Sequence, residues 1–173
     1  MQMVSEMPEE LKGVGEAVKA MIRQVEASWR RTRGGRAIDY ATLERQVAAG
    51  AAAIERASHH AVLQGLSLDQ PRVGIEGQVY HRVGRDEADY YTVAGPVRVL
   101  RTWYRVHGHR NAQTVNAVSL RSGVVADGWL PATAQAMAYQ LQQGTAREAE
   151  LTAQQRGRLH DLEGYVAEAR GTR

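Results

Sequence analysis

Residues 78–105 read QVYHRVGRDEADYYTVAGPVRVLRTWYR. Apolar and polar residues alternate toward the end of this stretch, between Val97 and Arg105, which is typical of a β-strand. Odd-numbered residues of that strand share one face and even-numbered residues share the other. Because neither face is purely apolar, we expect a sheet that is partly solvated. The sequence Ala94-Gly95-Pro96 predicts a tight turn just before it.

Outward from this strand, the sequence predicts a small antiparallel β-meander. Its strands are expected at 72–75, 78–83, 90–94 and 97–105. The carboxylates of Asp86, Glu87 and Asp89 then fall in a hairpin loop, where solvated acids are ordinary. A metal or acid–base role for them would require a histidine or a distant acid alongside.

Two amphipathic helices are predicted before the meander. The first starts at Pro8, and glycines at 34 and 35 end it. Its apolar residues recur at 3-4 spacing: Leu11, Val14, Val18, Met21, Ile22, Val25 and Trp29. Asp39 is placed to cap a second helix that runs to about Leu66. A short glycine loop between long helices predicts an antiparallel helical hairpin, used as a scaffold or for oligomerisation.

A helical pair is predicted after the meander, following an irregular stretch at 106–123. Leu130-Pro131 opens its first helix, with Ala134, Met137, Ala138 and Leu141 inward and Gly144 at its end. Thr145 and Glu148 form a capping box for the second. The expected fold class is therefore α+β: an N-terminal antiparallel helical hairpin (1–68), a small antiparallel β-meander (69–123) and a C-terminal helical pair (124–173). The three parts can form one domain.

The composition excludes several classes of site. None of the 173 residues is cysteine, so disulfides, cysteine-ligated zinc and thiol catalysis are excluded. No apolar run reaches the length of about 18 residues of a spanning helix, and the N-terminus has no signal-peptide pattern. We expect a soluble cytoplasmic protein without a membrane partner.

Positive charge concentrates in the middle of the chain. Residues 72–123 hold 8 basic and 4 acidic residues, whereas the flanks are balanced or slightly acidic. Arginines here alternate with tyrosine and tryptophan, and guanidinium groups suit phosphate. The predicted nucleic-acid-binding residues are Arg82, Arg85, Arg98, Arg101, Arg105 and Arg110. The alternative is a surface hairpin whose arginines pair with the acids between Asp86 and Asp89.

No catalytic or phosphate-loop motif is present in the sequence. His81, His107 and His109 could form a three-histidine metal site, but turn or surface histidines are the simpler interpretation. We therefore expect no cofactor, no metal, no small-molecule substrate and no enzymatic activity. Catalysis would require the acids at 86–89 to converge with His107 or His109.

Part of the chain resembles a known family. The residues that carry the resemblance lie at 79–85, 91–105, 120–125 and 131–150. They resemble the N-terminal region of ISKra4-type insertion-sequence transposases, in which a T-x-x-G-x-V-x-V-x-R-x-x-Y hairpin precedes a helical pair. Here that pattern runs from Thr92 to Tyr104. The cysteine pairs of many members are absent, and the chain ends at Arg173 without the family's acidic catalytic domain. The resemblance therefore implies neither a metal site nor catalytic residues.

Together these observations predict a non-catalytic DNA-binding module, in which the arginine-rich β-hairpin grips the nucleic-acid backbone. The alternative is a protein-interaction or oligomerisation subunit that acts through its helical hairpin. A homodimer formed by that hairpin is compatible with both.

Overall fold

The computed structural model describes residues 7–35, 37–108, 112–126 and 128–144. It confirms the α+β class, with N-terminal helices and a four-stranded antiparallel sheet in the order β1-β2-β3-β4. The chain divides into two compact units, Met1–Ala61 and Val62–Arg173. The meander and the C-terminal helix thus belong to one unit, together with the last residues of the second helix. Within the described ranges, no helix is both long and apolar enough to cross a membrane.

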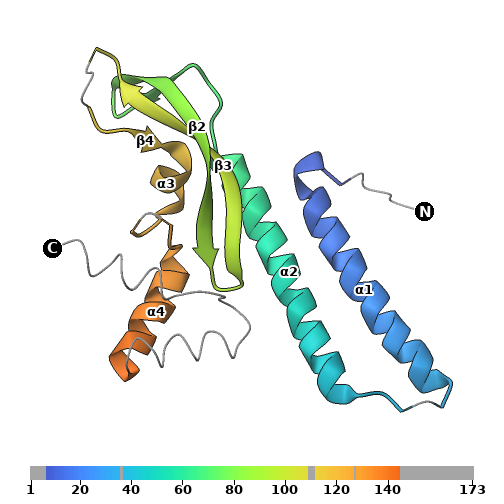
Figure 1. The fold of residues 1–173 in the computed structure, drawn as a ribbon. Helices are drawn as coiled ribbons and strands as arrows, with labels where there is room; N and C mark the ends of the chain where they lie inside the picture. The colour runs from blue at the N-terminus through green and yellow to red at the C-terminus, as the bar shows by residue number, and fades with distance from the viewer. Residues whose placement is uncertain (1–6, 36, 109–111, 127, 145–173) are drawn as a thin grey trace. The chain divides into compact units, whose positions relative to one another are not determined.

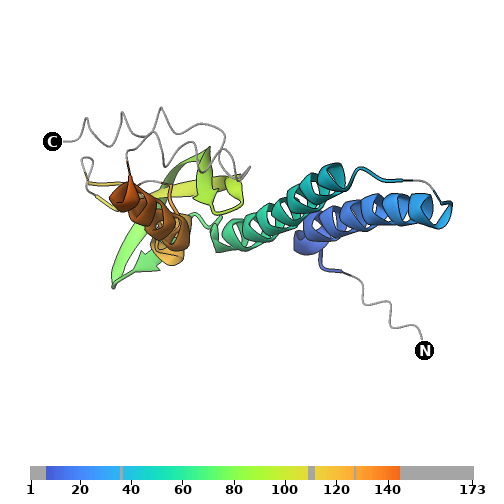
Figure 2. The same cartoon turned by 90° about the horizontal axis from the view of Figure 1, so that it is seen from below.

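The first unit is the expected helical hairpin. A 3-10 turn, η1 (Glu9–Leu11), leads into α1 (Lys12–Arg33), and α2 (Tyr40–Leu66) returns antiparallel to it (Figures 1 and 2). Asp39 caps α2 as predicted, because its Oδ1 accepts a hydrogen bond from the Thr42 amide at 3.2 Å. The helices approach each other at Gly50, where a Cβ would lie 3.1 Å from Met21 Cγ.

The sheet corrects two expectations. After β1 (Arg72–Ile75), the strand β2 is continuous over Gln78–Thr92, so the separate strands at 78–83 and 90–94 were wrong. The acids at 86–89 consequently lie within a strand and not in a loop. A run of polar residues such as 86–89 is typical of a turn, which explains the wrong expectation. In the fold, arginines on the neighbouring strand pair with Asp86 and Asp89. A β-bulge between Arg82 and Gly84 shifts the register by one residue.

The strand β3 (Gly95–Val106) pairs with β2 along its whole length. The turn that joins them is Val93-Ala94, one residue earlier than predicted. Thr92 closes it: its hydroxyl donates to Gly95 O at 2.7 Å and accepts from the Ala94 amide at 3.1 Å. Gly95 has φ of 113°, a value that L side chains rarely adopt.

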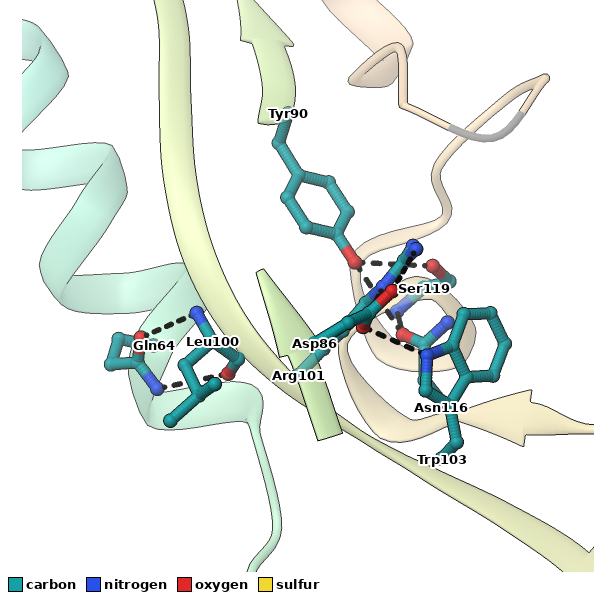
Figure 3. A network of polar contacts seen from close by, with 8 residues as sticks. All are labelled: Gln64, Asp86, Tyr90, Leu100, Arg101, Trp103, Asn116 and Ser119. Carbon is teal, nitrogen blue, oxygen red and sulfur yellow. Dashed lines mark hydrogen bonds and ion pairs between the residues drawn. The ribbon is translucent and has the colours of Figure 1, made fainter. Parts of the chain in front are cut away.

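The core of the second unit combines side chains from four elements, α2, β2, β3 and α3. Its buried side chains are Leu63, Tyr90, Val97, Val99 and Val118. Beside this cluster, the Gln64 side chain makes two hydrogen bonds to the backbone of Leu100 (Figure 3). The end of α2 therefore covers β3 at Leu100, on the edge of β3 that pairs with β4 at Trp103 and Tyr104.

Two short elements were missed at 106–123, which sequence reasoning interpreted as loop and irregular strand. They are β4 (Val115–Asn116) and α3 (Ala117–Ser122). Asn116 caps α3, since its Oδ1 accepts from the Ser119 amide at 2.8 Å, and Gly123 ends α3 in the left-handed conformation. This Asn-to-Gly spacing was the available signal. Figure 1 shows α3 next to β4.

The helix α4 (Pro131–Gln143) begins and ends as predicted. Its inward face was partly wrong: Thr133 is buried and Met137 is half-buried, whereas Ala138 and Leu141 are exposed. The Trp129 ring stacks on Tyr91 at 4.9 Å, so the segment before α4 attaches to the tip of β2. The predicted helix from Thr145 lies outside the described residues.

Candidate functional site

Two of the predicted arginines, Arg98 and Arg101, form ion pairs across the β2–β3 hairpin. Arg98 and Asp89 are directly opposite in the register, and Arg98 Nε and Nη2 donate to the two carboxylate oxygens at 2.9 and 3.0 Å. These hydrogen bonds from Arg98 lower the pKa of Asp89. The Arg98 side chain is 66% exposed, so the pair lies in water, where such pairs contribute little to stability.

Arg101 forms a second and more buried pair. Its Nε and Nη2 donate to the oxygens of Asp86 at 2.8 and 3.0 Å, and Trp103 Nε1 donates to the same carboxylate at 2.8 Å (Figure 3). The guanidinium also lies 4.4 Å from the centre of the Trp103 ring. Hydrogen bonds from Arg101, and then from Trp103, lower the pKa of Asp86. With only 16% of its side chain exposed, Arg101 holds the hairpin together.

Tyr90 extends this polar group toward α3. Its hydroxyl lies 3.4 Å from Asn116 Oδ1 and 3.3 Å from the Ser119 hydroxyl (Figure 3). Tyr90 is fully buried, so these contacts satisfy a phenol inside the core. The network fixes α3 against the sheet and brings no reactive group to the surface.

Arg82 and Arg85 converge on a single acid. Arg82 Nη1 donates to Asp69 Oδ1 at 2.6 Å, and Arg85 forms an ion pair with the same oxygen. The bulge makes this possible, since it places residues three apart on one face of the strand. Two guanidinium groups therefore share one carboxylate, and a positive charge is left over.

Of the two remaining predicted arginines, the structure describes Arg105 and does not describe Arg110. Arg105 is half-buried and lies opposite His81 in the register. Across the next strand, His81 is opposite Arg72, which sequence reasoning did not select. The His107 ring packs on His81 with ring centroids 4.3 Å apart. Arg110 lies outside the described residues.

The histidines form a pair, and His109 lies outside the described ranges. In the part of the chain that the structure describes, no three His, Asp or Glu side chains come together in a way that could hold a metal ion. Asp86 and Asp89 are each bonded to an arginine, and the Asp69 carboxylate that sequence reasoning overlooked comes from the segment between α2 and β1. No sequence pattern links Asp69 to the arginines, because only the folded chain brings them together.

The first unit carries a second candidate surface. Along η1 and α1, five apolar side chains are between 37% and 59% exposed: Leu11, Val18, Ile22, Val25 and Trp29. The residues of α1 that are buried are Gly15 and Ser28. The apolar side chains that define the amphipathic pattern are thus mostly outside the hairpin's own packing.

Comparison of the chain with protein-family models, with curated proteins and with solved structures found no match.

Proposed function

We propose that this protein is a non-catalytic subunit that self-associates through α1, with a second copy of the chain covering the exposed apolar side chains. The observation that carries this proposal is the spacing of those side chains. Positions 11, 18, 22, 25 and 29 follow the 3-4 repeat of a coiled-coil seam. We call these five residues the α1 seam.

Charge complementarity favours a second copy in antiparallel orientation. The beginning of the helical segment carries three acids, Glu9, Glu10 and Glu16, against Lys12 and Lys19. Its end carries Arg30, Arg31 and Arg33 against Glu26. In an antiparallel pair, the acidic end of one α1 lies beside the basic end of the other. A parallel pair would place like charges together, which is unfavourable. Helix dipoles also oppose each other in the antiparallel arrangement.

The test compares two valines of similar exposure. Val25 in the seam is 43% exposed, and Val125 in the second unit is 49% exposed. In sedimentation velocity, we expect wild type and Val125→Glu to be dimeric and Val25→Glu to be monomeric with unchanged helix content. Wild type that stays monomeric at the highest attainable concentration contradicts the proposal, as does a Val25→Glu variant that still dimerises.

A second candidate function is binding of a nucleic-acid backbone by the β-hairpin, in a module related to a transposase N-terminal region. The observation in its favour is the excess charge where Arg82 and Arg85 share Asp69. Surface ion pairs such as Arg98–Asp89 are weak enough to open for a phosphate. We do not include Arg101 among the residues proposed to contact nucleic acid, because it bonds Asp86 and stacks on Trp103.

This candidate is tested with a labelled random duplex and a single strand at two salt concentrations. Arg82→Ala, Arg85→Ala and Arg98→Ala should each weaken binding and reduce the salt slope on duplex DNA by about 0.9 per lost phosphate contact. Arg45→Ala removes the same charge from an exposed position of α2 and serves as the control. Absence of binding at low salt would exclude the function.

A further inference from the structure

The segment between α2 and β1 carries an acid onto the β-hairpin. Arg82 Nη1 donates to Asp69 Oδ1 at 2.6 Å, and Arg85 forms an ion pair with that same oxygen. We call Arg82 and Arg85 the arginine pair. Convergent guanidinium groups are the usual protein ligands of phosphate oxygens, so the carboxylate of Asp69 stands where an oxygen of a phosphate group would be bound.

The backbone on both sides of Asp69 is fastened to the sheet. The Tyr104 hydroxyl contacts the carbonyls of Leu68 at 2.9 Å and of Gln70 at 3.1 Å. One residue further, the Arg82 amide donates to the Pro71 carbonyl at 3.1 Å. Tyr104 is directly opposite Arg82 in the register, so its side chain lies on the same face of the sheet. The fold therefore holds the Asp69 carboxylate over the arginine pair.

The contact between the acid and the arginine pair is open to solvent. The side chains of Arg82 and Arg85 are 39% and 40% exposed, and that of Asp69 is 62% exposed. Ion pairs with this exposure are weak, so another anion can replace the carboxylate. Both ion pairs of Asp69 use one oxygen, whereas a phosphate group offers a separate oxygen to each guanidinium.

We propose that the arginine pair is a phosphate-binding site for which Asp69 is a built-in competitor. The carboxylate occupies the site in the free protein and moves aside when a phosphate group binds. Identification of that phosphate as part of a nucleic-acid backbone rests on the second candidate function. A free phosphate compound has the same chemistry, and the experiment separates the two sources.

The first measurement compares Asp69→Asn with Glu87→Gln, using a labelled duplex oligonucleotide and inorganic pyrophosphate as separate probes. Glu87 is exposed and lies two residues after Arg85 on the same face of β2, so its variant removes the same charge nearby. We expect Asp69→Asn to bind the probe about three- to tenfold more tightly than wild type, because the competing ion pairs are lost. Glu87→Gln should change the affinity by less than about twofold, as expected for a screened surface charge.

The second measurement removes the fastening of Asp69 without removing a charge. Tyr104→Phe deletes the hydroxyl that holds Leu68 and Gln70, so Asp69 should leave the arginine pair more readily and the affinity for the probe should rise. In the Asp69→Asn background, Tyr104→Phe should have no further effect. This non-additivity is the signature of a shared mechanism. Thermal unfolding checks that every variant is folded.

The outcomes separate the competition from the wider function. If Arg98→Ala weakens oligonucleotide binding but Asp69→Asn binds both probes no better than Glu87→Gln, the competition is wrong although the nucleic-acid function stands. If neither wild type nor Asp69→Asn binds the oligonucleotide but Asp69→Asn binds pyrophosphate more tightly than wild type does, the competition is supported and the ligand is a free phosphate compound. Failure of Asp69→Asn to bind either probe overturns both.

Discussion

Gln64 supplies to Leu100 the two hydrogen bonds that a neighbouring strand would otherwise make. Its Nε2 donates to the Leu100 carbonyl and its Oε1 accepts from the Leu100 amide, both at 3.1 Å. A primary amide has the same donor and acceptor as a peptide group, so the side chain ends the sheet at this point. At Leu100, β3 is thereby closed to pairing with another chain.

Gln64→Ala should destabilise the second unit by about 1 kcal/mol, because two hydrogen bonds to a partly exposed backbone are lost. Hydrogen exchange of the Leu100 amide should accelerate more than that of other β3 amides. Urea unfolding and exchange mass spectrometry measure both effects. Gln142→Ala, at an exposed position of α4, is the control. Equal exchange rates in Gln64→Ala and wild type would contradict this role.

Asp86→Asn should destabilise the protein at neutral pH by about 1–3 kcal/mol, since a charge-assisted pair with Arg101 becomes a neutral contact. The pKa of Asp86 is lowered in the folded state, so its contribution is present above the unfolded pKa of about 3.9 and is lost as the pH falls through the folded value. The difference in the free energy of unfolding between Asp86→Asn and wild type should therefore decrease at acidic pH.

Urea unfolding at neutral and acidic pH tests this sign, with Trp103 fluorescence as a local reporter. Glu87→Gln, the exposed next residue of β2, gives the matched control. If the free energy of unfolding of Asp86→Asn stays below that of wild type by the same amount at both pH values, the carboxylate charge does not stabilise the hairpin.

Gly50→Ala should stabilise the first unit less than Gly13→Ala. Both glycines lie inside helices, where alanine is favoured by about 1 kcal/mol. A Cβ at position 13 meets nothing within 4 Å, whereas one at position 50 approaches Met21 Cγ to 3.1 Å. Gly50→Leu should be destabilising by about 1–3 kcal/mol through overpacking. Thermal unfolding ranks the three variants, and equal gains from both alanines would mean that α1 does not press on Gly50.

Tyr104→Phe should loosen the segment that follows α2. The buried Tyr104 hydroxyl contacts the carbonyls of Leu68 at 2.9 Å and of Gln70 at 3.1 Å, and it donates its proton between them. Its removal should cost about 1–2 kcal/mol and increase proteolysis near residues 68–71. Tyr139→Phe, at an exposed tyrosine of α4, should change neither. Unchanged cleavage in Tyr104→Phe would refute the anchoring role.

The helices α1, α2 and α4 could be predicted from local patterns, whereas the continuous strand β2, the helix α3 and the site could not. Asp39, Leu66 and Pro131 mark their helix ends because capping and propensity act over a few residues. The pairing of Arg82 and Arg85 with Asp69 depends on a contact between segments that no local pattern connects. Likewise the acids of β2 resemble a loop until β3 supplies arginines opposite Asp86 and Asp89.

The resemblance to a transposase hairpin involves residues that have structural roles here. Thr92 and Gly95 shape the turn, Val97 and Val99 fill the core, and Arg101 bonds Asp86. A motif of this kind describes how a β-hairpin is built. Whether the hairpin also binds DNA depends on the charges around it, which the motif does not contain.

The bulge at residues 82–84 determines which residues of β2 lie on each face of the sheet. Beyond it, Asp86 and Tyr90 face the core, and Arg85 faces the same side as Arg82. Val83 is the extra residue of the bulge, so its deletion would leave Arg82 opposite Tyr104 and Gly84 opposite Trp103 in a regular ladder, with Arg85 and Tyr90 on their present faces. Insertion of one residue after Arg85 would instead turn the rest of the strand over and expose Tyr90. Length variation in this hairpin should therefore be tolerated in its loops and at the bulge, and not in the regularly paired part of β2.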